Sequence, residues 1–202
     1  MAIIADGQGI KVIKDTTDYV LKEVDSGYYY SHGVEAKNDF VIDTNKIHKV
    51  NGVLKLPLDN GKFVMFIDTI TNPPWEGNHY YFYQGFNNIL KNYQVGESAY
   101  EYGCWYLINI ENGKIDTLFS PPIYSPSNLY YGYSFSNMIY EFRNVTFKNN
   151  NTNRKYKIEY EGVMTNGFKW IDDYSFLFYT YILPMNKFDK NSNKYYILEI
   201  KH

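Results

Sequence analysis

Four histidines are the first residues in this sequence that could do chemistry. They are His32, His48, His79 and His202. No two of them have the spacing of a metal-binding helix or a zinc ribbon. His79 has the most distinctive neighbours, because it lies between Trp75 and Tyr80. A loop histidine is more often solvated than ligating, so we predict no metal site.

The sequence also contains no motif for nucleophilic catalysis or for cofactor binding. Cys104 is the single cysteine, which excludes an internal disulfide and a multi-cysteine metal site. It precedes Trp105 at the start of a predicted strand, where a small buried thiol is ordinary. The sequence has no Gly-x-Ser-x-Gly, and Gly7-Gln8-Gly9 opens no helix after a strand, as a phosphate-binding loop requires. We predict no catalytic residues and no cofactor.

Carboxylates offer the remaining route to an enzyme. Glycoside hydrolysis needs two acids about 5–10 Å apart across a sugar site. The candidates each border an aromatic strand: Asp43, Asp68, Asp172 and Asp173. Asp172 and Asp173 equally suit a tight turn between two strands, as Asp residues often do. A carboxylate-based glycoside hydrolase is therefore the alternative function.

Aromatic residues dominate the composition, with 23 Tyr, 13 Phe and 3 Trp. Exposed Tyr and Trp make good binding groups, because they combine a large rigid area with a polar tip. Residues 72–83, NPPWEGNHYYFY, form the predicted recognition loop. The predicted binding residues are Trp75, His79, Tyr80, Tyr124, Tyr131 and Asp172. Because strands alternate their faces, runs such as 80–83 cannot bury every ring on one side. Packing between sheets could equally bury these rings.

Short aromatic or β-branched runs between dense turns favour an all-β chain. Asn-Gly occurs at 51–52, 60–61, 112–113 and 166–167. At 202 residues we expect one domain spanning 1–202. Two stretches have helical character: 14–24 as a short helix and 85–93 as one further turn. Everything else is predicted to be strand or loop.

Residues 104–119, CWYLINIENGKIDTLF, predict a hairpin. Asn112-Gly113 readily forms a two-residue type I′ turn. That turn would place Ile110 opposite Ile115 and Tyr106 opposite Phe119. One face would then be apolar.

Segments similar to this hairpin recur along the chain. Aligning Tyr19, Phe63, Tyr106, Tyr156 and Tyr196 gives spacings of 44, 43, 50 and 40 residues. This period resembles that of a four-stranded β-propeller blade. The segments from Ile123 and Phe168 also resemble the blade element in which a polar turn precedes a strand. The resemblance implies a small propeller of four or five blades, in which the first and last strands share a sheet. A β-sandwich or an irregular barrel is the alternative.

The charge pattern limits the partners. The net charge is −2 with both signs interspersed, so a nucleic-acid partner is not expected. No apolar run reaches the roughly 18 residues of a membrane span. Residues 1–15 lack a charged leader, so we expect a cytoplasmic protein, or a secreted or periplasmic one if a leader was removed.

The leading functional hypothesis is non-catalytic recognition by aromatic-rich loops. The partner would be a protein, as for a bacterial inhibitor, immunity protein or adaptor, or else a glycan. The hypothesis rests on a general expectation, because small domains without catalytic motifs often act as inhibitors, immunity partners or adaptors.

Overall fold

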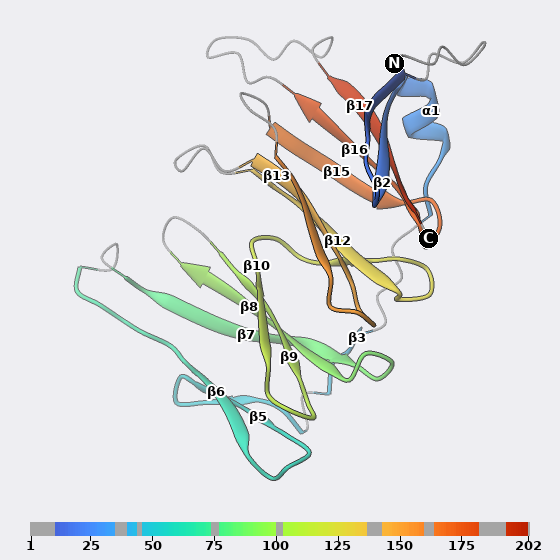
Figure 1. Ribbon diagram of the computed structural model, residues 1–202. Coiled ribbons are helices and arrows are strands. Elements are labelled where there is room, and N and C mark those ends of the chain that lie inside the picture. Colours follow the sequence, from blue (N-terminus) through green and yellow to red (C-terminus); the bar gives the residue numbers. More distant parts are fainter. Residues whose placement is uncertain are drawn as a thin grey trace. The chain divides into compact units, whose positions relative to one another are not determined.

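The structure of the protein is a computed structural model that describes residues 11–34, 40–43, 46–73, 77–99, 103–136, 143–159, 164–181 and 193–201 (Figure 1). The chain divides into two compact units. Unit 1 combines residues up to 37 with those from 123 onward, and unit 2 comprises residues 38–122. Each unit contains two antiparallel sheets.

Unit 1 consists of a five-stranded and a four-stranded sheet. The first has the order β1 (Lys11–Asp15), β2 (Tyr19–Val24), β17 (Lys194–Ile200), β16 (Ser175–Tyr181) and β15 (Met164–Trp170). The second has the order β11 (Ile123–Tyr124), β12 (Tyr130–Ser136), β13 (Arg143–Asn149) and β14 (Lys155–Glu159). Helix α1 (Ser26–Ser31) follows β2, and the Asp25 carboxylate accepts the Tyr28 amide at 2.7 Å as its N-cap.

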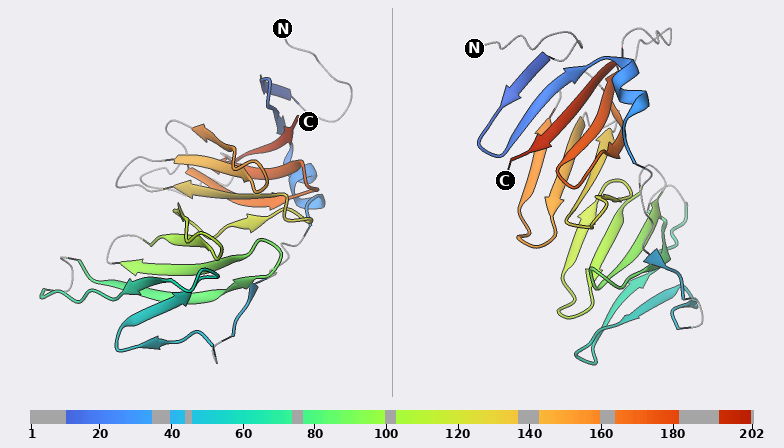
Figure 2. Two further views of the ribbon diagram at one scale, coloured as in Figure 1. Left: turned by 60° about the horizontal axis from the view of Figure 1, so that its bottom comes forward. Right: turned by 90° about the vertical axis from the view of Figure 1, so that its right-hand side faces the viewer.

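The core of unit 1 is aromatic and draws on both of its sheets. Phe147 comes from the four-stranded sheet, whereas Trp170, Phe176 and Phe178 come from the five-stranded one, and all are at most 1% exposed. The Trp170 indole also donates to the Ile123 carbonyl at 2.8 Å. The two sheets therefore form two layers around one core (Figure 2).

Unit 2 pairs a five-stranded sheet with a three-stranded one. The larger sheet has the order β10 (Ile115–Leu118), β9 (Trp105–Asn109), β8 (Asn92–Ala99), β7 (His79–Asn87) and β3 (Phe40–Val41). The smaller has the order β4 (Lys49–Val50), β5 (Val53–Pro57) and β6 (Phe63–Ile67). Leu54, Leu56 and Phe66 of the smaller sheet share a core with Val95 and Ile108 of the larger.

The all-β prediction is confirmed, whereas the propeller is not. No sheet closes on itself within the described residues. The five aligned segments all form strands, but β6 and β14 are edge strands and β2, β9 and β17 are interior. The five segments therefore do not occupy the same position in their sheets, as the strands of a blade repeat would. The predicted sharing of a sheet by the chain ends is confirmed, because β17 pairs with β2 and places Leu198 opposite Leu21.

Both helix predictions are wrong. Residues 14–24 contain the end of β1 and all of β2, joined by a turn in which the Thr16 hydroxyl accepts the Tyr19 amide at 3.0 Å. Pairing of β2 with β17 on one side and β1 on the other outweighs a weak local helical preference. Residues 85–93 contain the end of β7, a short connection and the start of β8, and the Asn87 side chain caps that connection by accepting the Ile89 and Leu90 amides.

The hairpin of β9 and β10 exists, but its register differs from the prediction. Ile115 lies opposite Ile108, two residues from the expected Ile110. The Asn109 side chain accepts the Glu111 and Asn112 amides and so builds a longer loop. The shift by an even number keeps Tyr106, Ile108 and Ile115 on one face. That face is not uniformly buried, since Ile115 is 44% exposed.

Within the part of the chain that the structure describes, no helix is long and apolar enough to cross a membrane.

Candidate functional site

The predicted binding residues of unit 1 lie in two different settings. Tyr124 and Tyr131 are direct partners on β11 and β12, with ring centroids 5.8 Å apart, and both are buried. Asp172 is exposed in the turn between β15 and β16, where its carboxylate accepts the Tyr174 amide at 2.8 Å. The two tyrosines pack within unit 1 and the aspartate shapes a turn, so their binding roles stay predictions.

The predicted residues of unit 2 begin with His79 and Tyr80 on β7. Tyr80 is 41% exposed, and the side-chain amide of Asn78 donates to its hydroxyl at 3.2 Å. Tyr81 and Tyr83 instead pack against the core of unit 2, so the expected division of this aromatic run between two faces is confirmed. Trp75 lies outside the described residues.

His79 belongs to a polar cluster around the Glu97 carboxylate, which the sequence analysis did not identify. The His79 Nδ1 lies 2.6 Å from Glu97 Oε1, and the Tyr106 hydroxyl donates to Oε2 at 2.5 Å. The side chain of Tyr81 also hydrogen bonds to this carboxylate, and the Cys104 thiol is near enough for the carboxylate to raise its pKa. We call these five residues the Glu97 centre. β7, β8 and β9 position four of them, and the residue just before β9 supplies the thiol.

Electrostatics keep Glu97 ionised although its side chain is only 4% exposed. Burial acts to raise the pKa of Glu97, but the hydrogen bonds from Tyr106, His79 and Tyr81 outweigh it and lower the pKa. Burial and the adjacent carboxylate raise the pKa of Tyr106 and of Cys104. Cys104 is therefore a protonated thiol, not a nucleophilic thiolate.

The Glu97 centre could orient a histidine, as carboxylates do in catalytic dyads. An ionised Glu97 requires the Nδ1 of His79 to carry the hydrogen. The carboxylate already receives side-chain donors from Tyr106, His79 and Tyr81, however, which is typical of a structural network. Among the described residues, no group of three or more His, Cys, Asp or Glu is placed to hold a metal ion. The one signal in the sequence was an acidic residue at an inward position of the alternating strand β8.

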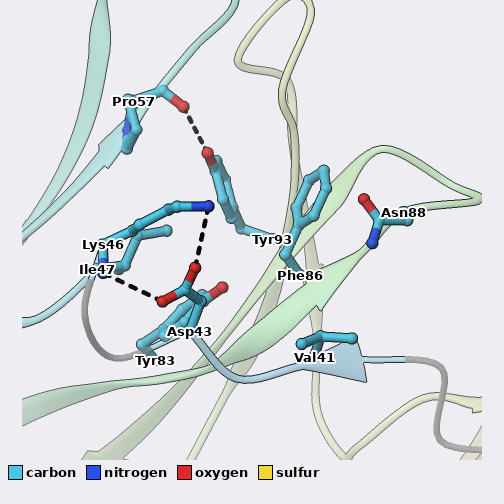
Figure 3. A pocket seen from close by; sticks show the side chains of 9 residues that line it. All are labelled: Val41, Asp43, Lys46, Ile47, Pro57, Tyr83, Phe86, Asn88 and Tyr93. Carbon is cyan, nitrogen blue, oxygen red and sulfur yellow. Dashed lines mark hydrogen bonds and ion pairs between the residues drawn. The ribbon is translucent and has the colours of Figure 1, made fainter.

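A pocket of about 410 Å³ is lined in part by residues of β7 and β8, the strands that also carry the Glu97 centre (Figure 3). Most of its wall is apolar or aromatic: Val41, Ile47, Pro57, Tyr83, Phe86 and Tyr93. Its volume is within the range of small-molecule sites.

A β-bulge in β7 creates the aromatic side of this pocket. Residues three apart on a regular strand point to opposite faces, yet Tyr83 and Phe86 both pack against the core of unit 2. The pairing of β7 with β8 shifts between Tyr83 and Gly85, which brings both rings to one side. Gly85 has a φ of +136° and its backbone approaches Phe40 so closely that a Cβ would lie 2.9 Å away. Only glycine suits that position.

The polar groups of the pocket are few and only partly satisfied. Asp43 accepts the Lys46 amide at 3.3 Å and pairs with the Lys46 ammonium at 3.2 Å. The Tyr93 hydroxyl donates to the Pro57 carbonyl at 2.8 Å. Among the described residues the buried Tyr83 hydroxyl has no hydrogen-bond partner. Burial, with contributions from Tyr93 and Asp43, raises the pKa of Tyr83 to about 12.

The other side of the three-stranded sheet exposes apolar side chains. We define the outer apolar face by the following residues: Val50, Val53, Phe63, Met65 and Ile67. Val50 pairs with Val53, and Val53 with Ile67. Phe63, Met65 and Ile67 alternate with the inward-facing Val64 and Phe66 and are 50–58% exposed. Lys55 lies opposite Met65, and its ammonium is 3.7 Å from the centroid of the Phe63 ring.

The four carboxylates considered for a glycoside hydrolase each have local partners. Asp68 accepts the Tyr81 amide at 2.9 Å and pairs with Lys49 at 2.6 Å. Asp173 accepts the Ser127 amide at 2.8 Å. Together with the turn contacts of Asp43 and Asp172, these bonds give every candidate acid a structural role.

Comparison of the chain with protein-family models, with curated proteins and with solved structures found no match. The functional argument therefore comes from the site geometry alone.

Proposed function

We propose that the protein is a non-catalytic recognition protein that binds another protein through its outer apolar face. The observation that carries this proposal is the exposure of Val50, Phe63, Met65 and Ile67, each 50–58% accessible, on neighbouring positions of one sheet. A solvated side of an antiparallel sheet normally carries polar residues. Contiguous exposed apolar residues instead mark interaction sites.

The charges near this face indicate the chemistry of the partner. Lys55 lies beside it, opposite Met65 and next to the Phe63 ring, and Lys62 is exposed in the turn that precedes Phe63. Carboxylates facing these cations would contribute orientation and association rate more than affinity. The partner is therefore a protein whose apolar contact surface is bordered by acidic residues.

The alternative, a carboxylate-based glycoside hydrolase, has less support. It requires two acids facing one cavity, and Asp43 is the one carboxylate among the described residues that line the 410 Å³ pocket. A glycan partner stays a prediction, and so does recognition by residues 72–83, although 79–83 belong to strand β7 and not to a loop. The propeller arrangement also stays a proposal, supported by the succession of antiparallel sheets along the chain and by the pairing of β17 with β2.

Affinity capture from the native source tests the proposal. The bait proteins are the wild type, Met65→Glu in the outer apolar face, and Ile115→Glu as a matched control. Ile115 is 44% exposed on β10, so the control adds the same charge to another exposed strand position. We expect one protein to be captured by the wild type and the control, and at least about tenfold less by Met65→Glu.

Equal recovery by all three baits would contradict the proposal. So would specific binding on a glycan array with no captured protein. Melting temperatures of the two variants, which should agree within a few degrees, show that both baits are folded.

A further inference from the structure

The pocket in unit 2 presents three aromatic rings from neighbouring strands. The centroids of Tyr83 and Tyr93 are 6.3 Å apart at an interplanar angle of 66°, and those of Phe86 and Tyr93 are 5.0 Å apart at 50°. Tilted rings direct their faces and edges in different directions. The face of an aromatic ring attracts cations electrostatically. Walls of this kind suit a positively charged organic group better than an anion.

One carboxylate of the pocket adds to this preference. Asp43 is about one-third exposed and its partner Lys46 is 83% exposed. Figure 3 shows the Lys46 ammonium beside the Asp43 carboxylate, with the Tyr93 ring close by. An exposed ion pair three residues apart contributes little stability. An ammonium already occupies a place next to the carboxylate, but it is held there weakly.

We propose that this pocket binds an organic ammonium ion, whose charged head replaces Lys46 at Asp43 and contacts the rings of Tyr83, Phe86 and Tyr93. The volume of about 410 Å³ leaves room for an apolar part beside Val41 and Ile47. This site does not rest on the proposed protein partner, because none of its residues belongs to the outer apolar face.

The Tyr83 hydroxyl narrows the class of ligand further. A buried hydroxyl without a partner is unfavourable. The Tyr83 hydroxyl has none among the residues that the structure describes, and it lies beside the Asp43 carboxylate (Figure 3). A ligand oxygen close to the ammonium would accept its hydrogen. Amino alcohols and their esters, of which choline is the simplest quaternary example, combine both features.

Titration with choline, followed by NMR, tests the proposal, with 3,3-dimethyl-1-butanol as a neutral molecule of the same shape. We expect choline to bind saturably and at least about tenfold more tightly than the neutral alcohol, because only choline has the cation. Asp43→Asn should weaken choline binding about tenfold, while its amide oxygen still accepts the Lys46 amide. Lys46→Met should strengthen choline binding several-fold, because it removes the competing ammonium.

A matched control removes a carboxylate elsewhere in unit 2. Glu111→Gln lies in the exposed loop between β9 and β10 and should leave choline binding unchanged. Tyr83→Phe should reduce the affinity for choline but not that for tetramethylammonium, which has no oxygen. NMR spectra of each variant establish that it is folded.

Several outcomes would overturn the proposal. They are the absence of saturable choline binding to the wild type, equal binding of the neutral alcohol, and tighter choline binding by Asp43→Asn. Saturable binding of isovalerate or of methyl glucoside in the same pocket, with no choline binding, would assign the site to an anion or a sugar instead. A failure of protein capture by the outer apolar face would leave all these measurements unaffected.

Discussion

The Glu97 centre and the 410 Å³ pocket that Asp43 lines, here called the Asp43 pocket, use similar side chains at two positions along β7 and β8. In each, a carboxylate is placed among tyrosines. Glu97 is 4% exposed and accepts hydrogen bonds from three side chains, those of Tyr106, His79 and Tyr81. Asp43 is about one-third exposed and pairs with an exposed lysine, next to a buried tyrosine hydroxyl without a partner among the described residues. The first arrangement stabilises the fold, whereas the second retains capacity to bind.

The largest expected difference between the two concerns removal of the carboxylate. Glu97→Ala removes the acceptor of the Tyr106 hydroxyl and the partner of the His79 ring from a buried position. We expect unfolding to require about 3–5 kcal/mol less free energy than in the wild type, as for breaking other buried charge networks. Urea denaturation measures this change.

Asp43→Ala serves as the comparison, with an expected loss of about 1 kcal/mol or less, since its ion pair is exposed. Equal losses of unfolding free energy for Glu97→Ala and Asp43→Ala would contradict the distinction between a structural and a binding carboxylate.

A smaller effect is expected from Tyr106→Phe, which deletes one hydroxyl and keeps the ring against Phe66, 5.2 Å away between centroids. A hydrogen bond to a charged group contributes about 1.5–3 kcal/mol, so we expect a loss in that range by urea denaturation. A change below about 0.5 kcal/mol would indicate that the remaining donors of the Glu97 centre compensate fully.

The pH dependence of stability distinguishes the two carboxylates without changing their size. The folded-state pKa of Glu97 is lowered, so its stabilisation is fully present above the unfolded pKa of about 4.3. It is lost as pH falls through the lower folded pKa. Urea denaturation between pH 6 and pH 3 should therefore show a steeper loss for the wild type than for Glu97→Gln. Parallel curves would contradict this assignment.

Local chemistry made some of this arrangement predictable from the sequence. The Asp172 turn and the division of residues 80–83 between two faces depend on neighbours or on strand alternation, whereas the pairing of the last strand with β2 was expected only from the propeller resemblance. The sequence also singled out His79, but as a residue of a recognition loop, whereas it begins strand β7 and contacts Glu97. The Glu97 centre was missed because His79 and Glu97 are 18 residues apart and meet only through the register of β7 with β8.

The pocket could not be predicted for a related reason. Tyr83 and Phe86 share a side only because the chain bulges at Gly85, and an isolated glycine within a strand suggests a bulge without locating its effect. The hairpin register was wrong by two residues because the Asn109 side chain stabilises a loop that competes with the Asn112-Gly113 turn. Such competition is decided by side-chain hydrogen bonds that a turn dipeptide does not reveal.

The smallest expected effect gives the most direct test of unused binding capacity. Tyr83→Phe removes a buried hydroxyl that has no partner among the described residues, whereas Tyr106→Phe removes one that donates to a carboxylate. Both substitutions delete one oxygen from a half-buried ring on the same face. Because an unsatisfied buried hydroxyl is itself unfavourable, Tyr83→Phe should leave the free energy of unfolding unchanged or raise it by up to about 1 kcal/mol. A loss as large as that of Tyr106→Phe would mean that the Tyr83 hydroxyl is already satisfied, and the pocket would then lack the capacity that distinguishes it from the Glu97 centre.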